Sequence, residues 1–169
     1  REWIERQLNT SLSPWLPLFW ILLRLLPFLG VYVVLGYRPQ SDVSEYYYPI
    51  GLVALDGGIP YRDHYSGYSP LFGYWLAPFL AIWRDPRVVV LAITMVEGLA
   101  VQVTYRYYQT NRSPGDRLFR ALFYYLLPVP FVMCVLSGQE DVILWLFAVL
   151  AIPLMQRQPF VAGLVLGLG

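Results

Sequence analysis

Long apolar runs alternate with short polar segments along this chain of 169 residues. A membrane-spanning helix needs about 17–25 predominantly apolar residues, and several runs reach or approach that length. The candidate spans are residues 15–37, 88–105, 118–136 and 142–155, and a further apolar run covers residues 160–169. Pro128 and Pro130 are expected to kink the third span. The pattern predicts an all-α polytopic membrane protein in which residues 1–169 form one transmembrane domain.

Residues 69–83 form an apolar segment whose position decides the topology. The segment is shorter than the roughly 17 residues of a spanning helix, and Pro78 interrupts it. We expect it to lie in the membrane interface as an amphipathic or re-entrant element. With a cytoplasmic N-terminus, the inner arginines are then Arg1, Arg6, Arg106, Arg112, Arg117, Arg120 and Arg157, and the outer ones are Arg38, Arg62, Arg84 and Arg87. This excess on the inner side follows the positive-inside rule, so residues 38–87 are predicted to form an outer loop with interfacial helices.

Composition supports the membrane class and excludes several functions. The chain is 57% hydrophobic and 14% charged, whereas soluble domains average about 45–50% and about 25%. All basic residues are arginines, so neither a Schiff-base lysine nor a lysine phosphate clamp is available. The formal net charge of +1 argues against a nucleic-acid partner. Cys134 is the single cysteine, so no internal disulfide is possible. The chain lacks an initiator Met and stops within an apolar run, and we expect it to be the N-terminal part of a longer protein.

The polar stretch after the first span opens with Asp42, which should lie at headgroup level. A helix is predicted from Asp42 to Asp56, ended by the following Gly-Gly pair and kinked or split at Pro49. The spacing of Asp42 and Glu45 is typical of a capping box at a helix start. A capping carboxylate can still direct a free oxygen at a substrate, so both roles stay open.

The loop after this helix carries polar and aromatic side chains between Gly and Pro residues. Arg62 and Asp63 are candidates either for a mutual ion pair or for donor contacts. His64 is a candidate for proton transfer or metal binding, although a histidine without other ligands nearby is weak support for a metal. Tyr61 and Tyr68 could stack on a sugar ring or belong to the interfacial aromatic belt.

A second acidic motif, "SGQED" at residues 137–141, precedes the fourth predicted span. Glu140 and Asp141 could serve only to stabilise the helix dipole. The predicted topology places this motif on the same side as the first outer loop. We therefore expect Gln139, Glu140 or Asp141 to face Asp42 across a cavity.

Two charged residues interrupt the apolar spans. Arg24 and Glu97 are costly in a bilayer unless they are paired. Counting about 1.5 Å per residue places both at similar depth. We predict a structural ion pair between Arg24 and Glu97 that joins their two helices.

The outer-loop sequence "GGIPYRDHYSGYSPLFGYWLAPF", preceded by an Asp shortly after the first span and a Tyr-rich helix, resembles a known pattern. It is similar to the first outer loop of GT-C superfamily membrane glycosyltransferases, especially the family 87 polyprenol-phosphate-mannose-dependent mannosyltransferases. The catalytic subunits of GPI mannosyltransferases have a similar "G-x-PY…Y-x-P" run. "SGQEDVILWLFAVLAI" also resembles a later helix of that family, so the likeness spans roughly residues 30–169 as short, spaced motifs.

The resemblance implies an inverting hexosyltransferase with a GT-C-like N-terminal bundle that acts on the non-cytoplasmic face. Asp42 matches the family's catalytic Asp and would be the general base for the acceptor hydroxyl. A lipid-phosphate leaving group needs no protonating acid, so one carboxylate can suffice. Arg62 or Arg38 could neutralise the lipid phosphate. The expected substrate-binding residues are Glu45, Tyr46, Tyr61, Arg62, Asp63, His64, Tyr68, Gln139, Glu140 and Asp141.

The expected partners are a polyprenyl-phosphate sugar donor, a lipid or glycan acceptor and membrane lipids, without a cofactor, metal or nucleic acid. Mannose is implied by the resemblance alone, and arabinose or another lipid-linked sugar stays open. We expect a multi-pass protein of the plasma membrane if the source is prokaryotic. The fragment alone is expected to be inactive, because the family's later helices complete the donor site.

Two other functional hypotheses stay open. In a transporter or flippase fragment, Arg24, Glu97 and Gln102 would line a solute path. In a non-catalytic scaffold, the outer loop would bind partners.

Overall fold

The computed structural model describes residues 14–108 and 111–168, and this part of the chain is helical without a β-strand. In chain order the helices are α2 (Trp15–Trp20), the π-helical η1 (Ile21–Leu25), α3 (Leu26–Phe28), the π-helical η2 (Leu29–Val34), the π-helical η3 (Val43–Tyr47), α4 (Tyr48–Leu55), α5 (Pro70–Ile82), α6 (Arg87–Tyr107), α7 (Pro114–Leu126), α8 (Pro128–Phe131), the π-helical η4 (Val132–Leu136), α9 (Asp141–Ala151), the 3-10 helix η5 (Ile152–Leu154) and α10 (Pro159–Leu166). The predicted all-helical class is confirmed for these residues. Arg1 and Arg6, which entered the arginine count, lie outside them.

Two helices are long and apolar enough to cross a membrane. The segments α2 to η2 form one helix of 20 residues, Trp15–Val34, and α6 has 21 residues. A third candidate is the pair Pro114–Leu126 and Pro128–Leu136, which is bent by 58°. This bend confirms the kink expected at Pro128 and Pro130. The segment Asp141–Leu154 is shorter than a spanning helix requires.

The predicted spans therefore need correction at several ends. The first stops at Val34 rather than at Tyr37, because Gly36 has a φ of 70° and leaves the helix. The run at 142–155 does not reach spanning length, since its α-helix ends at Ala151 before Pro153. The last run forms α10, which begins at Pro159 and has only 8 residues.

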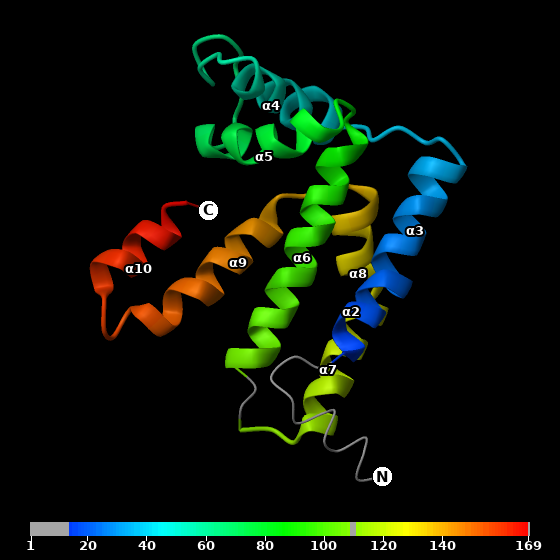
Figure 1. Ribbon diagram of the computed structural model, residues 1–169, viewed down its shortest axis with the longest axis vertical. Coiled ribbons are helices and arrows are strands. Elements are labelled where there is room, and N and C mark those ends of the chain that lie inside the picture. The colour runs from blue at the N-terminus through cyan, green and yellow to red at the C-terminus, as the bar shows by residue number, and fades with distance from the viewer. Residues whose placement is uncertain (1–13, 109–110, 169) are drawn as a thin grey trace.

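Helices α4 and α5 lie across one end of α6 rather than along it (Figure 1). With 13 residues, α5 is too short to span, and this agrees with the interfacial position predicted for residues 69–83. Glycines allow the two helices to approach closely. A Cβ at Gly51 would lie 2.5 Å from Leu80 Cδ1, and one at Gly73 would lie 2.9 Å from the Ile50 carbonyl oxygen. The α4–α5 pair therefore forms a compact cover over that end of α6.

The helix predicted from Asp42 to Asp56 is present but changes from a π-helix to an α-helix in the middle. Its first turns are π-helical up to Tyr47, and α4 begins at Tyr48 with Pro49 in its first turn. A proline has no N–H to donate there, so the start of an α-helix accommodates it. Gly57, with a φ of 81°, follows the end of the helix as expected.

The two predicted polar segments lie at the same end of the molecule. Gly138 packs against Val90 near the start of α6, where the α4–α5 pair also lies. The C-terminal end of α6 and the start of α7 lie at the opposite end (Figure 1). The end of α9 is near there too, because the Tyr108 hydroxyl donates to the Val149 carbonyl over 2.6 Å. The arginine-rich segment around Arg112 is thus separated from the acidic motifs by the length of α6.

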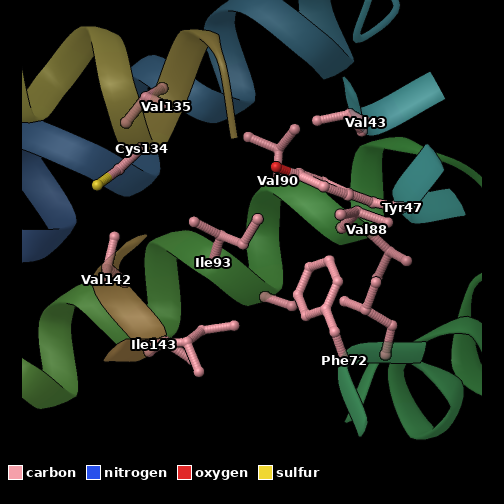
Figure 2. Close-up of a cluster of buried hydrophobic side chains, with 14 of the residues drawn as sticks. Val43, Tyr47, Phe72, Val88, Val90, Ile93, Cys134, Val135, Val142 and Ile143 are labelled. Atoms are coloured by element: carbon pink, nitrogen blue, oxygen red, sulfur yellow. The ribbon is translucent and has the colours of Figure 1, made fainter. Parts of the chain in front are cut away.

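One apolar core joins the cover to the long helices. Figure 2 shows Val43, Tyr47 and Phe72 near Val88 and Val90 of α6, with Ile93 and Ile143 further along. Of these, Val43, Tyr47 and Val90 are fully buried. This packing fixes η3 against α6 and so determines where Asp42, one residue before η3, can lie.

The predicted ion pair between Arg24 and Glu97 is present. Arg24 Nε lies 2.8 Å from Glu97 Oε2, and both side chains are completely buried. Their helices also meet where Gly98 faces Trp20, whose indole N–H donates to the Thr94 carbonyl over 2.8 Å. The pair joins α6 to the first long helix, as the matching depths suggested.

Candidate functional site

Asp42 lies half-buried at the start of η3, at the junction with the second acidic motif. Gln139 Nε2 lies 3.4 Å from Asp42 Oδ2, and Ser41 Oγ lies 3.4 Å from Asp42 Oδ1. The Asp42 side chain makes no capping hydrogen bond to the helix, and its backbone is itself helical. The capping-box interpretation of Asp42 is therefore wrong, and its carboxylate is directed toward Gln139 instead.

A second contact joins the same two segments. The buried Tyr47 hydroxyl donates a hydrogen bond to the Glu140 carboxylate. Burial raises the pKa of the Tyr47 phenol far above its ordinary value, and the hydrogen bond to Glu140 raises it further. Tyr47 is thus a neutral donor at physiological pH. Glu140 precedes α9 without a side-chain cap to it, so its carboxylate serves this contact rather than the helix end.

Tyr68 completes the cluster. Its ring meets the Tyr47 ring edge-on at a centroid separation of 4.7 Å and also contacts the Tyr46 ring at 5.8 Å. Burial raises the pKa of the Tyr68 phenol, with a further increase from the neighbouring Asp42 and Glu140 charges. We call the residues Asp42, Tyr47, Tyr68, Gln139 and Glu140 the acidic–tyrosine cluster.

A cavity of about 220 Å³ opens beside this cluster. Tyr68 and Glu140 line its polar side, while Phe72, Trp75 and Leu144 line its apolar side. A space with hydroxyl and carboxylate groups on one wall and aromatic and aliphatic groups on another suits an amphipathic ligand.

Gly138 makes the junction possible. Its φ of 62° is unfavourable for residues with a side chain. A Cβ there would lie 2.8 Å from Val43 Cγ2 and 3.2 Å from Val90 Cγ2. The turn therefore brings Gln139 and Glu140 against η3 only because residue 138 has no side chain.

Several predicted site residues lie at the edge of the cluster or outside it. Glu45 is exposed on the outer side of η3, and Asp141 is exposed in the first turn of α9. Tyr46 is half-buried and reaches the cluster only through its ring contact with Tyr68. Of the two acids in the second motif, Glu140 is therefore the one that contacts η3, through its bond to Tyr47.

The loop after α4 is held mainly by its own contacts. Arg62 Nη2 lies 2.7 Å from Asp63 Oδ2, and the Ile59 N–H donates to the same oxygen over 2.8 Å. The Arg62 guanidinium holds the pKa of the Asp63 carboxyl at about 2. The Tyr61 hydroxyl donates to the Tyr68 carbonyl over 2.5 Å, and His64 is half-buried. These residues shape the loop that positions Tyr68.

Tyr47 is the functional candidate that sequence reasoning missed. The sequence placed it only within the helix predicted from Asp42 to Asp56. A buried tyrosine hydroxyl requires a hydrogen-bond partner, and that requirement was the available signal. Phe72 and Trp75 were likewise assigned only to a surface helix, although they line the cavity.

No protein-family model matches the chain, and no curated protein or solved structure matches it. Among residues 14–108 and 111–168, no group of three or more His, Cys, Asp and Glu side chains could hold a metal ion.

Proposed function

We propose that this chain belongs to an integral membrane glycosyltransferase of the GT-C type, in which the acidic–tyrosine cluster binds and activates the acceptor. The observation that carries the proposal is the convergence of Asp42 with Gln139, 97 residues further along the chain. The cavity beside the cluster adds support through Tyr68 and Glu140, which line it together with apolar groups, whereas Asp42 and Gln139 lie outside its lining. The donor is a polyprenyl-phosphate sugar, and mannose is the first sugar to test.

In this reaction the acceptor hydroxyl oxygen attacks the anomeric carbon of the donor sugar. The bond from that carbon to the phosphate oxygen breaks, and polyprenyl phosphate leaves with the bonding electrons. Asp42 takes the acceptor proton as general base, and the product has an inverted anomeric configuration. The Gln139 amide donates to Asp42 Oδ2, and the acceptor hydroxyl would replace the exposed Ser41 hydroxyl, which lies 3.4 Å from Oδ1.

The arginines proposed for the donor phosphate differ in availability. Arg62 is bonded to Asp63, whereas Arg38 is exposed near the start of the outer loop. Arg38 also lies near enough to Asp85 to lower the pKa of that carboxyl, although Arg87 is its principal cause. Arg38 is therefore the better candidate for an approaching phosphate.

The transporter alternative has less support. Arg24 and Glu97 are both completely buried and bonded to each other, so neither is available to a solute. Gln102 is half-buried beside a different groove, with Pro17 and Leu99. The three residues do not line one path.

Sugar transfer from a polyprenyl-phosphate donor by the full-length protein in membranes tests the proposal. Asp42→Asn should lower the rate by about 10²–10⁴-fold while expression is retained. Asp56→Asn is the matched control, because Asp56 is an exposed carboxylate of the same loop, bonded to Arg84. Transfer that survives in Asp42→Asn would exclude the general-base role. Loss of substrate movement in Arg24→Leu with a silent Asp42→Asn would favour the transporter.

A further inference from the structure

A second cavity lies at the end of α6 away from the acidic–tyrosine cluster. It has a volume of about 120 Å³ and lies between α6, α7 and Trp145 of α9. At roughly 30 Å³ per water, it is large enough for several waters or one group of phosphate size. Its polar wall consists of Thr104, Tyr105, Arg120 and Tyr124.

The polar wall contains donors without partners among the described residues. Tyr105 is only 3% exposed, and neither its hydroxyl nor the buried Thr104 hydroxyl has a hydrogen-bond partner there. Arg117 does not line the cavity, but its guanidinium lies over the Tyr105 ring at 4.9 Å, and its buried Nε is also unpartnered within this part of the chain. Buried polar groups normally have partners, so these atoms point to a missing acceptor.

The charge around the cavity selects an anion. Residues 106–120 contain four arginines and a single acid, Asp116. Asp116 bonds to Arg120 through Nε at 3.1 Å, which leaves the terminal nitrogens of that guanidinium for another ligand. The Arg120 guanidinium and the two hydroxyl donors of the cavity form a set that suits a phosphate group.

A neighbouring groove indicates what the phosphate is attached to. The groove has a volume of about 450 Å³ and shares Arg120 and Tyr124 with the cavity. Its apolar wall is formed by Phe119, Phe123 and Leu127. A ligand with its charged group in the cavity and its hydrocarbon in the groove would match the polar lining of the first and the apolar lining of the second.

The depth of the cavity agrees with a lipid headgroup. Thr104 is three residues before the last residue of α6, Tyr107, or about 5 Å along the helix axis. Basic pockets between membrane helices at this level bind anionic headgroups. We propose that this cavity is a binding site for one anionic phospholipid, with its phosphate held by Arg120, Thr104 and Tyr105.

Lipid binding to the full-length protein in detergent tests the proposal, with native mass spectrometry counting retained lipid. The probes are phosphatidylglycerol, phosphatidylcholine and inorganic phosphate. We expect one phosphatidylglycerol per chain bound in preference to phosphatidylcholine. Arg120→Gln should weaken this binding by about tenfold, because it removes a hydrogen-bonding charge. Arg106→Gln is the matched control, since Arg106 is an exposed arginine at the same end.

Tyr105→Phe provides a second variant that keeps the packed ring and removes only the hydroxyl. It should weaken phosphatidylglycerol binding several-fold while the unfolding temperature without lipid stays close to that of the wild type. Equal losses in Arg106→Gln and Arg120→Gln would overturn the site in favour of diffuse attraction. Binding of phosphatidylcholine as strong as that of phosphatidylglycerol would overturn the choice of an anionic headgroup. If inorganic phosphate raised the unfolding temperature as much as phosphatidylglycerol does, the choice of a lipid would be overturned.

Discussion

Arg24 Nη1 donates to the carbonyl oxygen of Tyr125 over 2.9 Å, 101 residues further along the chain. That carbonyl belongs to the last turn of α7, which stops because Leu127 is extended, with a ψ of 134°, before Pro128. The final carbonyls of a helix have no donor within it. Arg24 therefore has two roles, since it neutralises Glu97 and also caps the broken helix α7.

These two roles make Arg24 more important to stability than a simple ion pair would be. Arg24→Leu should lower the free energy of unfolding by about 3–5 kcal/mol, because it leaves Glu97 buried without its counter-charge. The double variant Arg24→Leu with Glu97→Leu should lose less than the sum of the single losses. Denaturant unfolding in detergent measures this cycle.

The exposed pair Arg84–Asp56 is the matched control for that cycle. It has a similar N–O distance of 2.6 Å, but both side chains are more than half exposed. Its coupling should be below about 1 kcal/mol. A coupling for Arg24–Glu97 as small as this would contradict the stabilising role of the buried pair.

Gly138 should tolerate no side chain. Gly138→Ala combines a left-handed backbone with a contact of 2.8 Å to Val43, so we expect a loss of about 2–4 kcal/mol in the free energy of unfolding. Gly57→Ala is the control, because Gly57 also has a positive φ but nothing within 4 Å of its Cβ position. Similar losses in thermal unfolding for both variants would show that the packing at Val43 does not matter.

The bond from Tyr47 to Glu140 should make stability dependent on alkaline pH. The folded pKa of Tyr47 is raised, so its contribution is fully present below the unfolded value of about 10 and declines as the pH rises above it. Tyr47→Phe should cost about 1–3 kcal/mol near neutral pH, since Glu140 loses its donor. The difference between wild type and variant should narrow above about pH 10. Thermal unfolding across this range measures it, and a constant difference would contradict the assignment.

The predicted sidedness can be tested with single cysteines. After Cys134 is replaced by Ser, a cysteine at Ser137 should react with an impermeant reagent from outside, and one at Ser113 only from inside. Ser113 directly precedes α7 and Ser137 directly follows η4, so both positions lie off the long helices. Labelling of both from the same side would require a different topology.

Much of the architecture followed from simple physical rules. The cost of an isolated charge in a bilayer predicted the Arg24–Glu97 pair. The length of residues 69–83 predicted an element that does not span, and this segment forms the short helix α5. The span ends were less predictable, because the conformation at Gly36 and the early stop of α9 depend on local backbone geometry.

The candidate site, like the fold, could be predicted from the sequence only in part. The topology brought the two acidic motifs to the same end, so Gln139 near Asp42 was foreseeable as a neighbour. The sequence could not decide between the two roles left open for Asp42, because the spacing is the same whether the carboxylate turns toward the helix or toward Gln139. Tyr47 was missed because helical periodicity predicts which face of the helix its ring lies on, but not which group its hydroxyl bonds to.

The contacts of Arg24 also bear on how such a chain enters a membrane during synthesis. Its helix emerges first, but Glu97 and Tyr125 follow 73 and 101 residues later. At about 5–20 residues per second, the second partner arrives roughly 5–20 seconds after the arginine. An unpaired arginine at the centre of a helix costs about 2.5–3.5 kcal/mol on insertion. The helix Trp15–Val34 would therefore reach its final place only after α6 and α7 have been made.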